Sequence, residues 1–497
     1  MNGCAFVAKA QIRGRDALFR RFDVDTRALA ALRISLGVFL LTDLLLRSRD
    51  LVAHYTDAGV LPRSLLFEQF PGFSRLSIHA LSGDVWMQVL LFLVAGAVAL
   101  SLLLGYRTTL ATLASLVLLV SLQARNPLVL NAGDSVLRRL LIWGLFLPLG
   151  ERWSVDSLCE ENSQRRTASV ASAALLVQVV IIYTVNGLLK LRGDLWIRGD
   201  AIRYVFSLDQ LTVLLGDYVA QVPTLLRFFS KIWLAMVLSS VLLLLLTGWS
   251  RALFAALFAA MHFGMFLTMN LGLFPLISIA ALIPFFPGVV WDAAERRFPF
   301  DATRLHRWRD RIGDAVPITA FSALPTTVGR WKRRVVPAVV TALLLFVLVW
   351  NAASLGYAEL PTGADSAVNP EERRWDMFAP EPRGTDGWYA VPGRLESGER
   401  VDAFHRSAVR WERPREVAQT YPTHRWLVYL LDLRRARNDD LDHRFAGYLC
   451  HQWNSNHQNK LVNVTVYYVE QPTRLDGPES TSRVELVQHS CSSGGSS

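Results

Sequence analysis

The chain is poor in charge and in cysteine. Of its 497 residues only 19% are charged, whereas 52% are hydrophobic, and the mean hydropathy is +0.27. Soluble domains carry about 25% charged residues. This composition excludes a disordered protein and disfavours a soluble globule. The 4 cysteines are too few for a disulfide framework, and no Cys/His spacing predicts a metal site, so none is expected.

Motifs for several enzyme classes are also missing from the sequence. It contains no glycine-rich phosphate loop, HExxH, GxSxG or kinase motif, so nucleotide-driven transport and metalloprotease chemistry lack support. The net charge is +10, but the basic residues lie between apolar segments, where the positive-inside rule explains them. The expected partner is therefore the lipid bilayer and not nucleic acid.

Long apolar runs are plentiful before residue 357 and scarce after it. A run of about 20 uncharged residues is long enough to cross a bilayer. The sequence predicts an all-α polytopic membrane domain of eight to nine transmembrane helices, followed by a soluble α+β domain. The nine candidate spans are 28–46, 85–104, 108–123, 135–150, 168–190, 223–248, 252–270, 273–291 and 335–357.

The distribution of Lys and Arg predicts the orientation. With the N-terminus in the cytoplasm, 21 basic residues fall on the inner side and nine on the outer side. Nine spans then place the C-terminal domain outside the cell membrane, whereas an even number would place it in the cytoplasm. The expected segments are a basic cytoplasmic N-terminus (1–27), the transmembrane domain (28–291), a basic cytoplasmic loop (292–334), the last span (335–357) and the C-terminal domain (358–497).

The C-terminal domain has the pattern of a small α+β fold. Residues 387–393 and 460–469 alternate as strands do, residues 423–437 have helical spacing, and 492–497 read as a flexible end. Cys450 and Cys491 both lie here and could pair in an oxidising compartment, and the sequence leaves this open.

One polar face is predicted on the fifth span. Tyr183, Asn186 and Lys190 lie at i, i+3 and i+7, within about 60° of one another around a helix. Burial there disfavours the ammonium form of Lys190, so a neutral amine would be available as a base. The alternative is a lysine whose head snorkels to the membrane interface.

Two further polar residues occur before the fourth span, on the side predicted to be outer. Asp134 is explained by a helix N-cap role and an i,i+4 ion pair with Arg138, whereas Asn131 has no such simple explanation. His262 is in the middle of a span, where a neutral imidazole hydrogen-bonded to a neighbouring helix competes with a catalytic role. In the first span, Asp43 and Arg47 are expected to form a structural pair.

Several segments together resemble one membrane-protein family. They are RISLG (33–37), YTDAGVLP (55–62), NAGD (131–134), WSVD (153–156), KLRGDLW (190–196), GLFP (272–275) after His262, and WDMFAP (375–380). In this order they resemble the HTTM family, whose members are related to the vitamin K-dependent γ-glutamyl carboxylase.

The resemblance implies a chemistry for Lys190. In the carboxylase a lysine at the outer end of a membrane helix deprotonates vitamin K hydroquinone, which leads to carboxylation of a peptide glutamate. The implied catalytic set is Lys190 with Asn131, Asp134 and His262 around it. Tyr183, Asn186 and Trp196 would contact reduced vitamin K or menaquinone.

The resemblance is incomplete, because the family's Asn-His pair is represented by Asn131 without a histidine at 132–134. The function expected is quinone-linked modification of a secreted peptide or protein. The alternative is a non-catalytic membrane partner that assists maturation or export of a secreted peptide. A transporter is the weakest hypothesis, because no inverted repeat is visible in the sequence.

Overall fold

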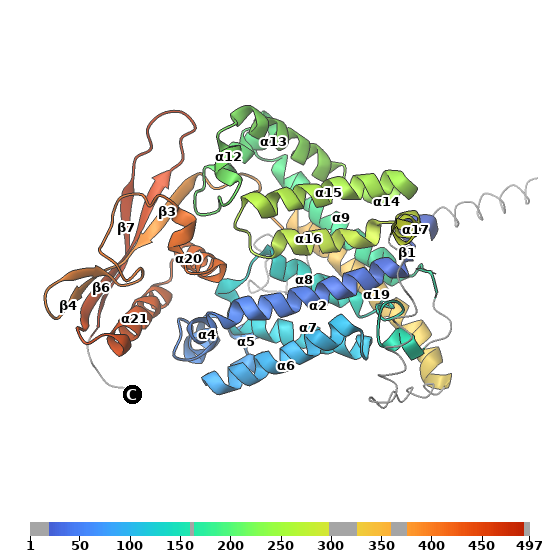
Figure 1. The fold of residues 1–497 in the computed structure, drawn as a ribbon, viewed down its shortest axis with the longest axis horizontal. Coiled ribbons are helices and arrows are strands. Elements are labelled where there is room, and N and C mark those ends of the chain that lie inside the picture. The colour runs from blue at the N-terminus through green and yellow to red at the C-terminus, as the bar shows by residue number, and fades with distance from the viewer. Residues whose placement is uncertain (1–18, 160–163, 298–325, 359–374, 492–497) are drawn as a thin grey trace, which may run out of the picture.

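A helical domain and a sheet domain lie side by side in the protein (Figure 1). The computed structural model describes residues 19–159, 164–297, 326–358 and 375–491. The expectations for most of the basic N-terminus, for most of the loop 292–334 and for the end 492–497 fall outside these residues.

Six helices of the described chain are long and apolar enough to cross a membrane. They are α2 (Thr26–Ser48), α6 (Val85–Leu104), α7 (Thr108–Arg125), α9 (Val170–Lys190), α15 (Gly248–Thr268) and α19 (Thr326–Ser354). A seventh is counted if α16 (Phe274–Leu282), η4 (Ile283–Phe285) and α17 (Gly288–Arg297) form one broken span, bent by 102°.

The predicted eight or nine spans are therefore not all found as full-length helices in the described residues. Within the predicted spans 135–150 and 223–248, α8 (Ala132–Gly144) has 13 residues and α13 (Pro223–Leu238) has 16, with α14 (Leu242–Leu245) after it. A bilayer core needs about 20 helical residues. The predicted span 273–291 bends where Pro284 and Pro287 remove backbone N–H groups.

Short elements fill the connections. They are β1 (Val24–Asp25), α3 (Leu51–Tyr55), α4 (Arg63–Gln69), α5 (Pro71–Ser74), η1 (Ile78–Ala80), η2 (Pro127–Val129), η3 (Asp156–Cys159), β2 (Arg166–Thr167), α10 (Asp194–Arg198), α11 (Ala201–Phe206) and α12 (Gly216–Ala220). β1 pairs with β2 at the end of the helical domain that is far from the sheet, whereas α4 lies at the end next to it (Figure 1).

The C-terminal region, called the tail below (375–491), is built on an antiparallel sheet. Its strands are β3 (Thr385–Ala390), β4 (Pro392–Leu395), β5 (Arg400–Asp402), β6 (Leu461–Pro472) and β7 (Ser482–Ser490). The order is β3-β6-β4-β5, and β7 also pairs with β6. Three helical elements complete the tail: η5 (Val417–Thr420), α20 (His424–Ala436) and α21 (Asp439–Asn456). The α+β prediction and the helix at 423–437 are confirmed, and α21 is an addition to them.

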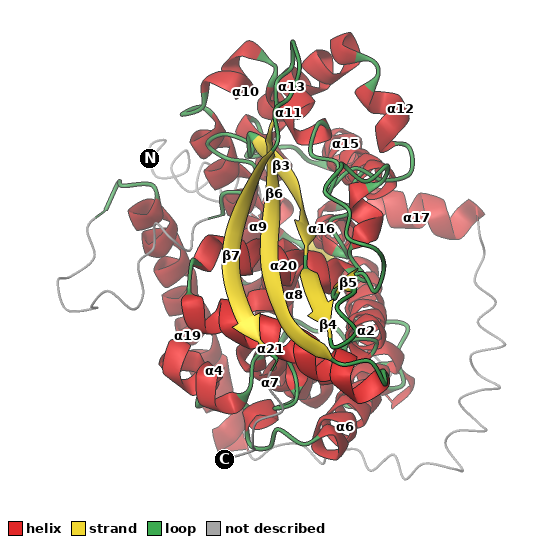
Figure 2. Ribbon diagram, turned by 90° about the vertical axis from the view of Figure 1, so that its left-hand side faces the viewer, coloured by secondary structure: helices red, strands yellow, loops and turns green. Residues whose placement is uncertain are grey.

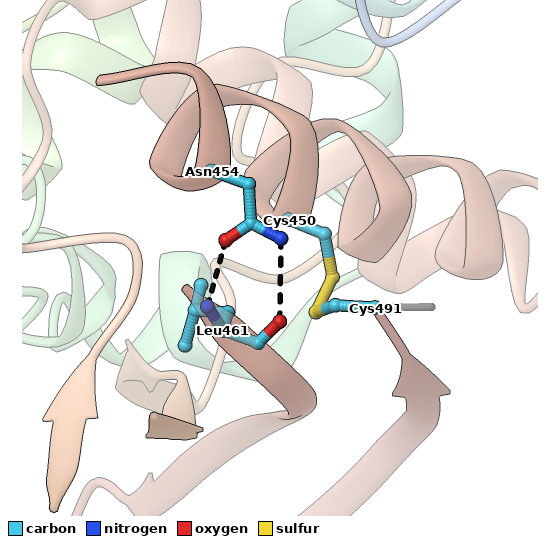
Figure 3. Close-up of a disulfide and its surroundings, with 4 residues drawn as sticks. All are labelled: Cys450, Asn454, Leu461 and Cys491. Atoms are coloured by element: carbon cyan, nitrogen blue, oxygen red, sulfur yellow. Dashed lines mark hydrogen bonds between the residues drawn. A yellow bond between two sulfur atoms is a disulfide. The ribbon is translucent and has the colours of Figure 1, made fainter. Parts of the chain in front are cut away.

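A disulfide closes the tail (Figure 3). Cys450 of α21 is bonded to Cys491, which directly follows β7, so the pairing left open by the sequence is formed. The side chain of Asn454 accepts a hydrogen bond from the Leu461 N–H and donates one to the Leu461 carbonyl, which joins α21 to β6. The bridge and these bonds fix the helix against the sheet.

The tail and the helical domain share one hydrophobic core. Tyr55, Val60 and Leu128 of the helical domain pack in the same buried cluster as Trp426 and Leu430 of α20. The His54 ring lies 4.7 Å from the Trp426 ring. Burial, together with Arg425 and Arg47, lowers the pKa of His54 to about 3, so this imidazole is neutral at the seam.

Four buried charged side chains cross this seam and are called the seam cluster: Asp43, Arg47, Asp134 and Arg425. Arg425 donates to Asp134 at 2.6 Å and to Asp43 at 2.7 Å. Arg47 donates to Asp43 at 2.7 Å and to Asp134 at 2.5 Å. The expected Asp43–Arg47 pair is confirmed. Asp134, however, pairs with Arg47 and Arg425, so its predicted pairing with Arg138 is wrong.

The seam cluster is electrically balanced. Burial and the neighbouring Arg47 act to lower the pKa of Arg425, but Asp134 and Asp43 hold that pKa above its ordinary value, so the guanidinium stays charged. Two cations face two carboxylates, and each carboxylate accepts hydrogen bonds from both arginines. Removing one member leaves a charge without its partner in a buried place.

We expect replacement of Cys450 and Cys491 by Ser to destabilise the tail. A bridge that closes a loop across 41 residues restricts the unfolded chain, and its loss typically costs about 2–4 kcal/mol. Thermal unfolding of the double variant in detergent, compared with the oxidised wild type, measures the effect. Equal melting temperatures would show that the bridge does not stabilise the tail.

Arg425→Met should destabilise the whole protein by about 3–5 kcal/mol, because it leaves Asp43 and Asp134 with one cation in a buried site. The matched control is Arg435→Met on the same helix, whose side chain is 70% exposed and should change stability by less than about 0.5 kcal/mol. Unfolding of both variants in the same detergent compares them. Equal losses of unfolding free energy in the two variants would contradict this expectation.

Asp442, in the first turn of α21, generates a prediction about pH. Burial and the neighbouring carboxylate Asp439 raise its pKa to about 7 from the ordinary 3.8. The folded protein therefore binds this proton more tightly than the unfolded chain, and stability falls as pH rises from about 4 to about 7.

Asp442→Asn removes this titration. The melting temperature of the variant, measured relative to wild type, should rise between pH 4 and pH 8, with a gain at pH 8 of about 3 °C or more. Subtracting the wild-type melting temperature at each pH removes the contribution of other titrating groups, such as His54, because both proteins contain them. A difference that does not change with pH would contradict the assignment.

Candidate functional site

A small cavity lies inside the helical domain beside the polar face of α9. Its volume is about 40 Å³, and Tyr183, Asn186 and Lys190 of α9 line it together with His262 of α15. Most of the remaining wall is apolar or aromatic and comes from α8, α13, α16 and the tail segment at 375–378. The predicted face of the fifth span is thus brought to one site.

Lys190 is the last residue of α9 and is only 1% exposed. Its Nζ donates to the carbonyl oxygen of Met377 at 2.9 Å and, at 3.4 Å, to that of Phe378. The same Nζ lies 3.8 Å from the centre of the Trp196 ring. In the part of the chain that the structure describes, no carboxylate forms a salt bridge with it, and Asp194 instead pairs with Arg198.

The start of the tail closes the site. Asn186 donates through its side-chain amide to the Met377 carbonyl at 3.0 Å, and the Trp196 indole donates to the Phe378 carbonyl at 2.8 Å. Two consecutive backbone carbonyls therefore accept hydrogen bonds from three of the predicted site residues. Gly193 permits this close approach, because a Cβ there would meet the Pro380 carbonyl oxygen at 2.0 Å.

Tyr183 and His262 form a second polar pair in the wall of the cavity. The Tyr183 hydroxyl lies 2.8 Å from Nε2 of His262, so the imidazole bonds a neighbouring helix as expected. Nδ1 of His262 has no hydrogen-bond partner within the described residues.

Asn131 and Asp134 lie outside the lining of this cavity. Asn131 is the N-cap of α8 and forms a capping box with Asp134, while Asp134 also belongs to the seam cluster. The Asn131 side-chain amide lies 3.0 Å from Nε2 of His424 in the tail. Burial and the neighbouring Arg425 lower the pKa of His424 to about 4, so this imidazole is neutral.

Sequence reasoning missed the parts of the site and seam that come from the tail. His424 lies 293 residues from Asn131 and Arg425 lies 291 residues from Asp134, so local spacing gives no sign of either contact. The carbonyls of Met377 and Phe378 are backbone groups and carry no residue-type signal. The segment WDMFAP (375–380) itself was noticed, through the family resemblance.

The cavity has an apolar and aromatic lining with a few polar groups, but it is too small for a quinone ring system. Aromatic and apolar walls with a few polar groups are typical of pockets for such ligands, which have volumes of about 300–1,000 Å³. A cavity of about 40 Å³ has room for about one water molecule. In this conformation Met377 and Phe378 occupy the space next to Lys190, so the fused rings of vitamin K or menaquinone do not fit.

Comparison with known proteins identifies the helical domain. A family model described as the HTTM domain matches residues 21–291, and this domain is found in membrane proteins related to the vitamin K-dependent carboxylase. Searches of curated proteins and of solved structures give no match. The matched residues include Lys190, Trp196 and His262 and make up more than half of the chain. The chain therefore belongs to the HTTM-domain family of membrane proteins.

Proposed function

We propose that this protein is a membrane enzyme of carboxylase-like architecture in which Lys190 acts as a base. The observation that carries the proposal is the environment of its amine. Nζ is buried at the end of a membrane helix, with two carbonyl oxygens and one aromatic ring as partners and no carboxylate bound to it within the described chain.

Such an environment favours base chemistry over a structural ion pair. An ammonium group without a counter-ion is disfavoured by burial, whereas a neutral amine keeps a lone pair that can accept a proton. Asp134 and Asp194, which could have formed an ion pair with Lys190, bind arginines instead. The exposed carboxylate of Asp376 acts on the amine through its charge but forms no salt bridge with it within the described residues.

The proposed reactant is reduced vitamin K or menaquinone, which supplies an acidic hydroxyl group and two electrons, with molecular oxygen as the proposed electron acceptor. Lys190 would take the hydroxyl proton, Trp196 and Tyr183 would contact the rings, and Asn186 and His262 would orient the polar groups. Because the present cavity is too small, Met377 and Phe378 must leave Lys190 before a reactant binds. No step is assigned to Asn131 or Asp134, which lie at the seam and not in the cavity wall.

The proposed location is the cell membrane, with the N-terminus in the cytoplasm and the tail outside. In support, the start of α2 and the tail lie at opposite ends of the helical domain (Figure 1), and the excess of basic residues falls on the side of the N-terminus. A tail outside the cell can meet a secreted peptide or protein, which we propose as the molecule that is modified.

One observation favours the alternative of a non-catalytic partner in peptide maturation or export. The amine of Lys190 already donates to two carbonyls, and the adjoining cavity holds about one water. A lysine that only anchors the tail to α9 would have the same contacts. The two functions differ in what happens when arginine replaces this lysine, because arginine can donate to carbonyls but cannot serve as a base.

The test measures oxidation of reduced menaquinone and of reduced vitamin K by dissolved oxygen in the presence of the purified protein, with and without a glutamate-containing peptide. We expect turnover by wild type and a loss of at least about 100-fold in both Lys190→Ala and Lys190→Arg. The matched control is Lys231→Ala, which removes an exposed lysine of α13 and should keep full activity.

Melting temperatures separate loss of chemistry from loss of the fold. Lys190→Arg should unfold within a few degrees of wild type, since it can still donate to the carbonyls of Met377 and Phe378. An active Lys190→Arg variant would contradict a base at this position. A folded wild type that oxidises neither quinol would favour the non-catalytic partner.

A further inference from the structure

β7 forms one open edge of the sheet in the tail. β7 pairs with β6 from Ser482 to Ser490, and within the described chain no strand pairs with its other side (Figure 2). Alternate residues of this strand therefore present backbone N–H and C=O groups along the margin of the sheet, although the β6–β7 register shifts opposite 485–487. An open edge of this length is a template for an added strand.

A groove adjoins one end of this edge. It has a volume of about 510 Å³ and lies between α4 and the pair formed by α21 and β7. His489 of β7 and Gly447 of α21 form one wall, and Leu65 and Glu68 of α4 form the other. Because Gly447 has no side chain, this residue does not project into the groove beside His489. The groove therefore reaches β7 at His489.

The charge of the groove favours a basic side chain. Glu68 and Asp440 both line it. Within the described residues no salt bridge or hydrogen bond engages the Glu68 carboxylate, and Asp440 accepts a hydrogen bond from the Gln69 amide. The arginine of the lining, Arg444, donates to the carbonyls of Asp57 and Gly59. Burial and the neighbouring His443 lower the pKa of His489, so this imidazole adds no positive charge near neutral pH.

We propose that the edge of β7 and this groove, called the edge groove, bind an extended segment of another polypeptide that carries a lysine or arginine. The segment adds to the sheet as a strand beside β7 and places its basic side chain between Glu68 and Asp440. The edge groove shares no lining residue with the cavity at Lys190. Peptide binding at the edge groove can therefore be tested independently of the chemistry proposed for Lys190.

The test uses a fluorescein-labelled nonapeptide of alternating Thr and Val with one Lys at each end, titrated with the full-length protein by fluorescence anisotropy. We expect saturable binding. Methylation of alternate backbone nitrogens of the peptide should weaken binding at least tenfold, because it removes the hydrogen bonds of an added strand without changing the side chains.

Charge reversal tests the groove. Glu68→Lys should weaken binding of the Lys peptide by roughly two- to fivefold and strengthen binding of a peptide with Glu at both ends. The matched control is Glu396→Lys, an exposed position in the tail outside the groove lining, which should leave both affinities unchanged. Lys190→Ala should also bind the peptide as wild type does.

Three results would overturn the proposal. The first is equal binding of the methylated and unmethylated peptides, and the second is an equal effect of Glu68→Lys and Glu396→Lys. The third is a dimer in solution that forms through β7 and excludes the peptide, which would assign the edge to a second copy of this chain.

Discussion

The joint between the helical domain and the tail depends on the buried charges of the seam cluster. Arg425 enters from the tail and binds Asp43 of α2 and Asp134 of α8 together with Arg47, so four charges compensate one another away from water. Charges buried in this way are tolerated only when all partners are present. The cluster thus specifies one docking position for α20, and the apolar packing of Trp426 against His54 surrounds it. The tail and the helical domain form one folded unit.

This docking has a direct consequence for Lys190. The residues that precede the sheet, Met377 and Phe378, lie against the end of α9 and supply the carbonyls that hold the amine. The site is therefore composite, with side chains from the membrane helices and a backbone cap from the tail. Under the proposed function, access of a quinol depends on displacement of that cap and not on a preformed channel. The small cavity shows where the amine of Lys190 lies. Its volume in this conformation does not define the size of the reactant.

Local patterns in the sequence were sufficient for some parts of this arrangement. The i, i+3, i+7 spacing placed Tyr183, Asn186 and Lys190 on one face, and α9 presents them to one cavity. The predicted eight or nine spans are confirmed only in part, since six helices of the described chain, or seven with the bent pair, are long and apolar enough to cross a membrane. Hydropathy alone does not distinguish a full-length helix from the short α8 or from a segment broken at Pro284 and Pro287. α21 was not predicted, although Leu441, Phe445 and Leu449 recur at every fourth position among charged residues. The partner of Asp134 was assigned to Arg138 because local spacing cannot report a contact made 291 residues away.

The central claim is that Asp134 and Arg425 act together to join the two parts of the protein. A double-mutant cycle with Asp134→Asn, Arg425→Met and the combined variant, followed by unfolding in one detergent, tests it most directly. Because each single substitution leaves a charge without its partner, the account predicts that the combined cost is smaller than the sum by about 2 kcal/mol or more. Costs that add to within about 0.5 kcal/mol would contradict it, because they would show that the two residues act independently.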